Sequence, residues 1–299
     1  DCSRTGYPQV ERVINLNADP GDALHYNRSL ALVGDIPASL ERLNQSLGAP
    51  AAAREEWLAN CAAKKAAWQE YKAERAKNPV LFDPYWGEEV LTQPAAILTA
   101  AAWSRAAGAI SIFDAGDVQA NGFQIVEDEC PDQTFTESGA SYMGFAVSAL
   151  LASAAASQPF YGLAFTGDGS LSMNPQILID GVEHGARGCI LLLDNGRMAA
   201  ISGLQEAQYG QEFATRNTLR VDYLAWARGV PGLLALDGGR SPQALQTALE
   251  QAFAHPGLSL IHLPVYYGAD PLGGMGVYGR WNVGNWCDEV QALRHQIGL

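Results

Sequence analysis

Two short polar motifs in the middle of the 299-residue chain combine residue types that bind a metal ion and a phosphate. Gly167–Gly169 (GDG) follows the apolar run Tyr161–Thr166, and Asp194–Asn195 (DN) follows the apolar run Cys189–Leu193. Asp168 and Asn195 offer the hard oxygen ligands that Mg²⁺ prefers. Gly167 and Gly169 allow a tight turn whose backbone N–H groups can approach an anion closely. The two motifs therefore predict a site for a magnesium-bound diphosphate.

The apolar runs before the motifs are typical of buried strands in a parallel sheet, and the segment Asn174–Glu183 between them is predicted to be the crossover helix. In a right-handed βαβ unit both strands end at the same edge of the sheet, where open α/β sheets bind ligands. A plain βα turn explains a lone Gly-Asp-Gly equally well. The second motif, 24 residues further on, favours the metal site.

This motif pair resembles the thiamine diphosphate signature GDG…NN, with Asp194 in place of the first Asn and Asn195 in place of the metal-binding Asn. Three further segments, in the right order, are similar to the family's pyrimidine-gripping turn, a following helix and its closing strand: Glu137–Ala146, Thr218–Gly229 and Leu258–Val265. The resemblance covers about residues 85–266. It extends most closely to trihydroxycyclohexanedione hydrolases and acetolactate synthases, and includes enzymes such as benzoylformate decarboxylase.

The resemblance implies a magnesium site and a diphosphate site. The side chains of Asp168 and Asn195 and the backbone carbonyl of Arg197 would bind Mg²⁺. Residues Gly167, Gly169 and Ser170 would hold the diphosphate at one end. The loop Asp114–Gln119, through Gly116 and Asp117, would hold its other end, although an ordinary polar βα loop explains those residues nearly as well.

Met143 aligns with the bulky apolar residue that supports the V-shaped cofactor in the family. A wedge there brings the pyrimidine amino group against C2 of the thiazolium, which makes Met143 the expected catalytic residue. Backbone groups of Ser141 and Met143 would bond the pyrimidine edge. A buried core methionine is the alternative, and the sequence Ser141–Gly144 (SYMG) argues against it.

The family also requires a glutamate at the pyrimidine N1′, carried by a separate pyrimidine-binding domain. Glu127 and Glu137 belong to the diphosphate-binding part and do not match it. We therefore expect a second polypeptide that supplies this glutamate, and hence a hetero-oligomer.

Composition excludes several other functions. The net charge of −13 argues against nucleic acid or an anionic membrane surface, which need basic patches. No run approaches the ~18 apolar residues of a membrane span. Five widely spaced cysteines without a C-x-x-C pair, and no secretory signal, predict a cytoplasmic protein. The five histidines lack metal-ligand spacing, and no Ser–His–Asp arrangement is supported.

The expected fold class is α/β, a parallel sheet with helices on both faces, preceded by the tail of a second α/β domain. The expected domains are 1–48 as the end of a central α/β domain, 49–80 as a helical linker, and 81–299 as the thiamine diphosphate- and magnesium-binding domain. In the linker, Trp57, Cys61, Trp68 and Tyr71 recur at helical spacing and predict one buried stripe. The Gly-rich segment Tyr266–Trp286 is expected to be a lid or a surface wrap, followed by a helix over about 287–297.

We thus expect one component of a split enzyme that cleaves or forms a C–C bond next to a carbonyl of a 2-oxo acid or 1,2-dione, as a lyase, decarboxylase or carboligase. Hydrolysis of a cyclic 1,2-dione, a non-catalytic subunit that senses the cofactor or a nucleotide, and a purely structural domain with an accidental motif are the alternatives.

Overall fold

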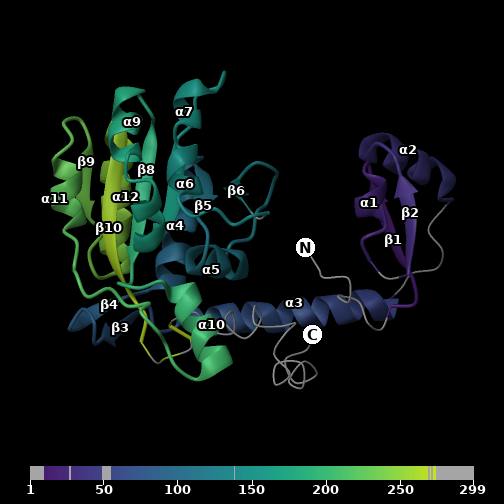
Figure 1. Cartoon of the computed structure of the whole chain (residues 1–299), viewed down its shortest axis with the longest axis horizontal. Helices are drawn as coiled ribbons and strands as arrows, with labels where there is room; N and C mark the ends of the chain where they lie inside the picture. Colours follow the sequence, from purple (N-terminus) through teal and green to yellow (C-terminus); the bar gives the residue numbers. More distant parts are fainter. Residues whose placement is uncertain are drawn as a thin grey trace. The chain divides into compact units, whose positions relative to one another are not determined.

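An eight-stranded sheet forms the centre of the larger part of the chain in this computed structural model (Figure 1). The structure describes residues 10–26, 28–48, 55–137, 139–268, 270 and 272–273. It divides into two compact units, Asp1–Ala66 and Ala67–Leu299, and each is described by itself.

The strands of the large sheet run in the order β3-β4-β10-β8-β7-β5-β6, and β9 also pairs with β10. Every described pairing in it is parallel except the β3–β4 hairpin, which is absent from the predicted elements. The bounds are β3 Val80–Asp83, β4 Glu88–Thr92, β5 Ile110–Phe113, β6 Thr134–Thr136, β7 Gly162–Gly167, β8 Gly188–Asp194, β9 Leu234–Asp237 and β10 Leu258–Tyr266. The predicted α/β fold with a mainly parallel sheet is confirmed.

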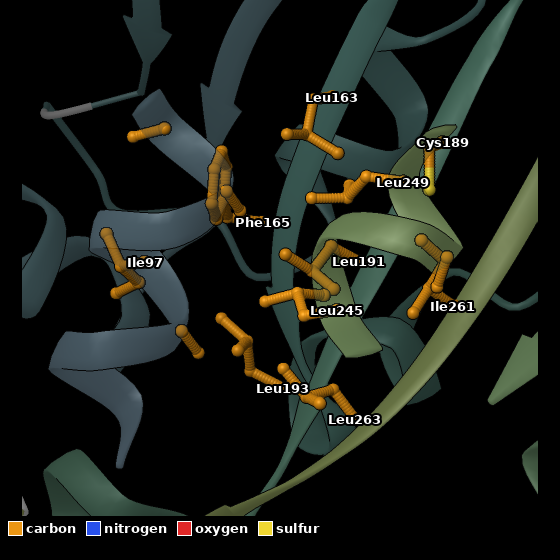
Figure 2. Packing of buried hydrophobic residues seen from close by; sticks show 14 of the residues in the cluster. Ile97, Leu163, Phe165, Cys189, Leu191, Leu193, Leu245, Leu249, Ile261 and Leu263 are labelled. Carbon is orange, nitrogen blue, oxygen red and sulfur yellow. The ribbon is translucent and has the colours of Figure 1, made fainter. Parts of the chain in front are cut away.

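Helices cover both faces of this sheet, because alternate side chains of each central strand point to opposite sides. In β7, Leu163 and Phe165 join one apolar cluster and Ala164 joins the other. Figure 2 shows the first cluster, in which Ile97 and Leu245 from two helices face the strands. The helices of this unit are α4 Gln93–Ala107, α5 Asp117–Ile125, α6 Phe145–Ala149, α7 Ala152–Ala155, α8 Asp168–Met173, α9 Ile177–Glu183, α10 Ala199–Tyr209, α11 Tyr223–Arg228 and α12 Pro242–Ala254.

Helix α4 begins where β4 ends, which matters for the site. The Thr92 hydroxyl accepts a hydrogen bond from the N–H of Ala95 at 3.2 Å and caps the helix, and Pro94 occupies its first turn. Gly108, with φ +69°, ends it. This placement puts Gln93 at the carboxyl edge of the sheet.

Two predicted helices have different bounds in the structure: one is shorter, and the other is divided. The predicted crossover helix Asn174–Glu183 is α9 alone, and a separate helix, α8, begins directly at Asp168. The predicted helix from Met143 to Ala155 is divided into α6 and α7. The N–H groups of Leu150 and Leu151 bond carbonyls three residues back rather than four, so the chain tightens between the two helices.

The smaller unit contains two parallel strands, β1 (Val13–Asn17) and β2 (Ser29–Val33), with helices α1 (Pro20–Ala23) and α2 (Ile36–Ser46). The Asp35 side chain caps α2 by accepting from the N–H of Ala38 at 2.9 Å. Apolar side chains of this unit remain exposed, including Ile14 at 65%. The division into domains 1–48, 49–80 and 81–299 stays a prediction.

Helix α3 (Glu55–Ala76) confirms the predicted helical segment, but its predicted buried stripe is wrong. Trp57 is 64% exposed and Cys61 is exposed. Trp68, 40% exposed, donates its indole N–H to the carbonyl of Gln124 at 3.2 Å. Most of the Gly-rich segment Tyr266–Trp286 and the whole helix expected after it lie outside the described residues. No helix in the described part of the chain is both long and apolar enough to cross a membrane.

Candidate cofactor and metal site

A pocket of about 240 Å³ opens at the carboxyl edge of the sheet, where β5, β7 and β8 end and α5 and α8 begin. All ten predicted site residues line it: Gly116, Asp117, Ser141, Met143, Gly167, Asp168, Gly169, Ser170, Asn195 and Arg197. They come from four separate stretches of the chain, so the structure brings together what the sequence spreads over 82 positions, from 116 to 197.

Asp168 is a buried carboxylate, 3% exposed. Its Oδ2 accepts a hydrogen bond from Asn217 Nδ2 at 2.7 Å. Burial, and then the negative charge of nearby Asp194, raise the pKa of Asp168 to about 7. Two buried carboxyl groups in one place are unfavourable without a cation, so the electrostatics of the pocket suit Mg²⁺.

The oxygen donors at this edge of the sheet suit a hard metal ion that is bound by the protein and a ligand together. Within the described residues no three His, Cys, Asp or Glu side chains are grouped as a metal site. Asp168 and Asn195 would supply one carboxylate and one amide oxygen, and Mg²⁺ is commonly completed by backbone, phosphate and water oxygens. The residues present therefore fit a magnesium ion bound together with a diphosphate.

Asp194, the departure from the family pattern, has a partner that the sequence did not reveal. Its Oδ2 lies 2.9 Å from Nε2 of His262, and its Oδ1 accepts from the N–H of Gly196 at 3.0 Å. His262 packs edge-to-face on Trp86 and lies 5.5 Å from the Tyr223 ring, centroid to centroid. The carboxylate is thus anchored to β10, and the turn after β8 is fixed.

The turn that carries Asn195 and Arg197 is rigid. Asn195 Oδ1 accepts from the N–H of Arg197 at 3.2 Å. Gly196 has φ +66°, and a Cβ there would lie 2.3 Å from the Tyr85 ring, so only glycine fits. The Arg197 guanidinium lies 3.1 Å from Glu212 and 4.1 Å from the centroid of Tyr267.

Gly169 lies where a side chain would fill the pocket. A Cβ at this position would stand 2.6 Å from the sulfur of Met198 and 3.3 Å from Cε of Met143. The first N–H groups of α8 have no partner within that helix. Gly169 and Ser170 therefore offer backbone N–H donors at the start of α8. The absence of a side chain at Gly169 keeps this part of the pocket open.

Asp117 begins α5 beside Gly116, whose φ is +88°. Burial raises the pKa of Asp117 to about 7, against the opposing effects of Arg75, Gln93 and Arg197. Arg75, at the end of α3, is 2% exposed. The segment predicted to be a polar loop is thus partly helical, and a buried arginine supports it.

The turn with Ser141 and Met143 is held by hydrogen bonds of Asp114, which is the first residue of the loop predicted to bind the diphosphate but is not one of the ten predicted site residues. Its Oδ1 accepts from the N–H of Gly144 at 2.8 Å, and its Oδ2 accepts from the hydroxyl of Thr166 at 2.8 Å. Ser141 and Gly144 have φ of +57° and +89°. The sequence signals for Asp114 are its position directly after a buried strand, β5, and its place at the start of the loop Asp114–Gln119.

Neither of the two glutamates considered for the cofactor's N1′ lines the pocket. Glu137 is engaged with the backbone, accepting from the N–H groups of Gly139 at 2.7 Å and Tyr142 at 3.1 Å. Glu127 pairs with Lys72 at 2.5 Å. Both have structural partners of their own.

Residues 114–263 match the family described as the thiamine pyrophosphate enzyme, C-terminal TPP binding domain. The chain is 30% identical over 136 residues to acetolactate synthase isozyme 1 large subunit of Escherichia coli (strain K12), covering 45% of this chain and 24% of that protein. It is 28% identical over 182 residues to 3D-(3,5/4)-trihydroxycyclohexane-1,2-dione hydrolase of Listeria monocytogenes serotype 4b (strain F2365), and this match covers 58% of this chain and 28% of that protein. The chain spans about a quarter of the length of these relatives.

A solved structure from Mycobacterium smegmatis, described as thiamin diphosphate-dependent, superposes with a TM-score of 0.62 over 87% of this chain and 45% of that one. Its sequence identity of 17% supports the fold alone.

Proposed function

This chain belongs to the thiamine pyrophosphate enzyme family, and on that premise we propose that it binds the diphosphate of thiamine diphosphate through Mg²⁺ and takes part in making or breaking a C–C bond next to a carbonyl. The observation that carries the proposal is the convergence of all ten predicted site residues on one pocket at the carboxyl edge of the sheet. When bound, the cofactor supplies a nucleophilic carbon that adds to a carbonyl and stabilises the negative charge left when the neighbouring bond breaks.

The chain's own residues bind and orient. Asp168, Asn195 and the carbonyl of Arg197 would hold the metal, and the backbone of Gly169 and Ser170 would hold the phosphates. The Asp194–His262 pair would keep the metal-binding turn in place from β10.

Met143 is the residue that we propose to bend the cofactor. Its Cε lies 3.3 Å from the position that a Cβ would take at Gly169, and Met143, Gly169 and Ser141 all line the pocket. Asp114 fixes the backbone next to it through Gly144. A rigid apolar wedge in that place would hold the two rings of the cofactor together.

We assign the acidic group required at the pyrimidine N1′ to protein outside these 299 residues, on a pyrimidine-binding domain of a second polypeptide. The structural partners of Glu127 and Glu137 support this assignment. The substrate class is a 2-oxo acid or a 1,2-dione. Hydrolysis of a cyclic 1,2-dione is a second candidate reaction, favoured by the similarity to the dione hydrolase over 58% of the chain.

The proposal is tested by calorimetric titration of the 299-residue chain with thiamine diphosphate, with Mg²⁺ and with excess chelator. We expect binding that depends on Mg²⁺. Turnover of 2-oxo acids and cyclic 1,2-diones is then measured with the chain alone and with a co-expressed pyrimidine-binding partner. Absence of Mg²⁺-dependent binding would refute the cofactor assignment. Turnover by the chain alone would refute the need for a partner, and binding without turnover in every combination would favour a sensor.

A further inference from the structure

Gln93 is a buried amide in the wall of the cofactor pocket, and it belongs to no motif in the sequence. It is the first residue of α4, is 1% exposed, and lines the pocket together with Gly116 and Asp117. Its Nε2 makes no hydrogen bond of acceptable geometry within the described residues. Buried amide donors are almost always paired, so an unpaired one beside an open pocket calls for a partner that enters the pocket.

The direction of this amide follows from a chain of hydrogen bonds that begins at an arginine. Arg75 can only donate, and its Nη2 lies 2.7 Å from Asn121 Oδ1, so that oxygen must be the acceptor. Asn121 Nδ2 is then fixed on the other side, where it donates to Gln93 Oε1 at 2.5 Å. The oxygen of Gln93 therefore faces Asn121, and its nitrogen is the end that makes no hydrogen bond within the geometric limits.

The surroundings of that nitrogen indicate the chemistry of its partner. Nε2 is a donor only, so the partner must be an acceptor. The protein's own acceptor beside it is the carboxylate of Asp117: an interaction with the Gln93 side chain lowers the pKa of Asp117, but the pair does not meet the distance and angle of a hydrogen bond within the described residues. Gly116 and Gly169 also line this pocket, and at a glycine the backbone can approach an anion closely.

We propose that Gln93 Nε2 donates a hydrogen bond to a phosphate oxygen of the bound cofactor, and that Arg75 and Asn121 are positioning residues that hold the amide in this orientation. The proposal rests on the proposed function, because it names one more contact to the same diphosphate. It adds a donor at the start of α4 to the turns that begin α5 and α8, which were identified from sequence. The phosphates would then be bound by residues that follow three strands, β4, β5 and β7.

The test compares dissociation constants of the full chain for two probes, thiamine diphosphate and inorganic pyrophosphate, each with Mg²⁺. Gln93→Glu keeps the oxygen that accepts from Asn121 and replaces only the donor. Gln93→Met removes both polar ends at similar size and adds no charge. Gln124→Met is the matched control, because Gln124 accepts from Arg75 Nη1 in the same cluster but does not line the pocket.

We expect both Gln93 variants to bind both probes roughly 10- to 100-fold more weakly, as for loss of a hydrogen bond to a charged group, with Gln93→Glu the weaker. Gln124→Met should bind like wild type. Circular dichroism and thermal midpoints without ligand monitor folding, and if one Gln93 variant does not fold the other carries the comparison.

Wild-type affinity in the Gln93 variants would overturn the proposal and leave the proposed function standing. An equal loss in Gln124→Met would show a general loosening of the cluster and would also overturn it. A wild-type chain that binds neither probe would refute the proposed function and this inference with it.

Discussion

Replacing Asp117 by Asn should make the stability of the protein less dependent on pH. Asp117 is 7% exposed, and burial raises its pKa from 3.8 to about 7, with Arg75 only partly offsetting the effect. A carboxyl group whose pKa is higher in the folded state holds its proton more tightly there than in the unfolded chain. Its contribution to the free energy of unfolding therefore falls as pH rises from about 4, and levels off above about 7.

The size of the effect follows from the two pKa values of Asp117. A shift of about 3 units corresponds to ~4 kcal/mol at full ionisation, at ~1.4 kcal/mol per unit. Between pH 5 and pH 8 the free energy of unfolding should fall by about 2–3 kcal/mol on account of Asp117. This is less than the full effect, because the carboxyl group of the unfolded chain is already largely ionised at pH 5. Asp117→Asn removes this dependence, and the lost favourable interaction with the start of α5 is smaller, at about 0.3–1 kcal/mol.

The measurement is urea unfolding of the chain without ligand at pH 5 and pH 8, followed by tryptophan fluorescence. From pH 5 to pH 8 the urea midpoint of unfolding should fall by about 1 M more in wild type than in Asp117→Asn. Asp180→Asn, which changes a partly exposed carboxylate on α9, is the control. Equal pH dependence in wild type and Asp117→Asn would refute the reasoning that this carboxyl is buried with a raised pKa.

Three further outcomes are expected. Asp168→Ala should abolish the Mg²⁺-dependent thermal stabilisation by thiamine diphosphate and Asn195→Ala should weaken it, whereas unchanged stabilisation in the first would disprove the metal assignment. His262→Ala should weaken Mg²⁺ binding by about 10-fold by releasing Asp194, measured by Mg²⁺ titration at saturating cofactor, and His262→Asn should recover part of the loss. Met143→Ala should slow proton–deuterium exchange at the cofactor's C2, in the chain reconstituted with the proposed partner, more than it weakens cofactor binding. A wild-type exchange rate would leave Met143 a packing residue only.

The positions of the Gly-Asp-Gly and Asp-Asn motifs could be predicted from sequence because each motif follows its own strand directly. Two adjacent parallel strands bring their carboxyl ends together whatever the details of packing, so Asp168 and Asn195 had to lie at one edge of the sheet. The fold class was predictable for the same reason, since β7 and β8 are buried on both faces and appear as continuous apolar runs.

The residues that the sequence did not reveal act across long separations. His262 is 68 positions from Asp194, and Gln93 is 28 positions from Asn121, so no local pattern links them. The stripe on α3 was predicted wrongly because helical spacing shows which residues share a face, not whether anything covers that face. The β3–β4 hairpin was missed because its strands are short and half-exposed.

The contacts of Arg75 also bear on the order in which the protein folds. Its Nη2 reaches Asn121, 46 positions away, while its Nε donates to the carbonyl of Leu272, 197 positions away, at 3.2 Å. Closing so long a loop is entropically costly, and contacts of this separation tend to form late. The wall of the pocket behind Asp117 should therefore consolidate after the central strands have paired. During synthesis, the Leu272 contact cannot form until residue 272 has been made, nearly 200 residues after Arg75, so this wall would be completed near the end of the process.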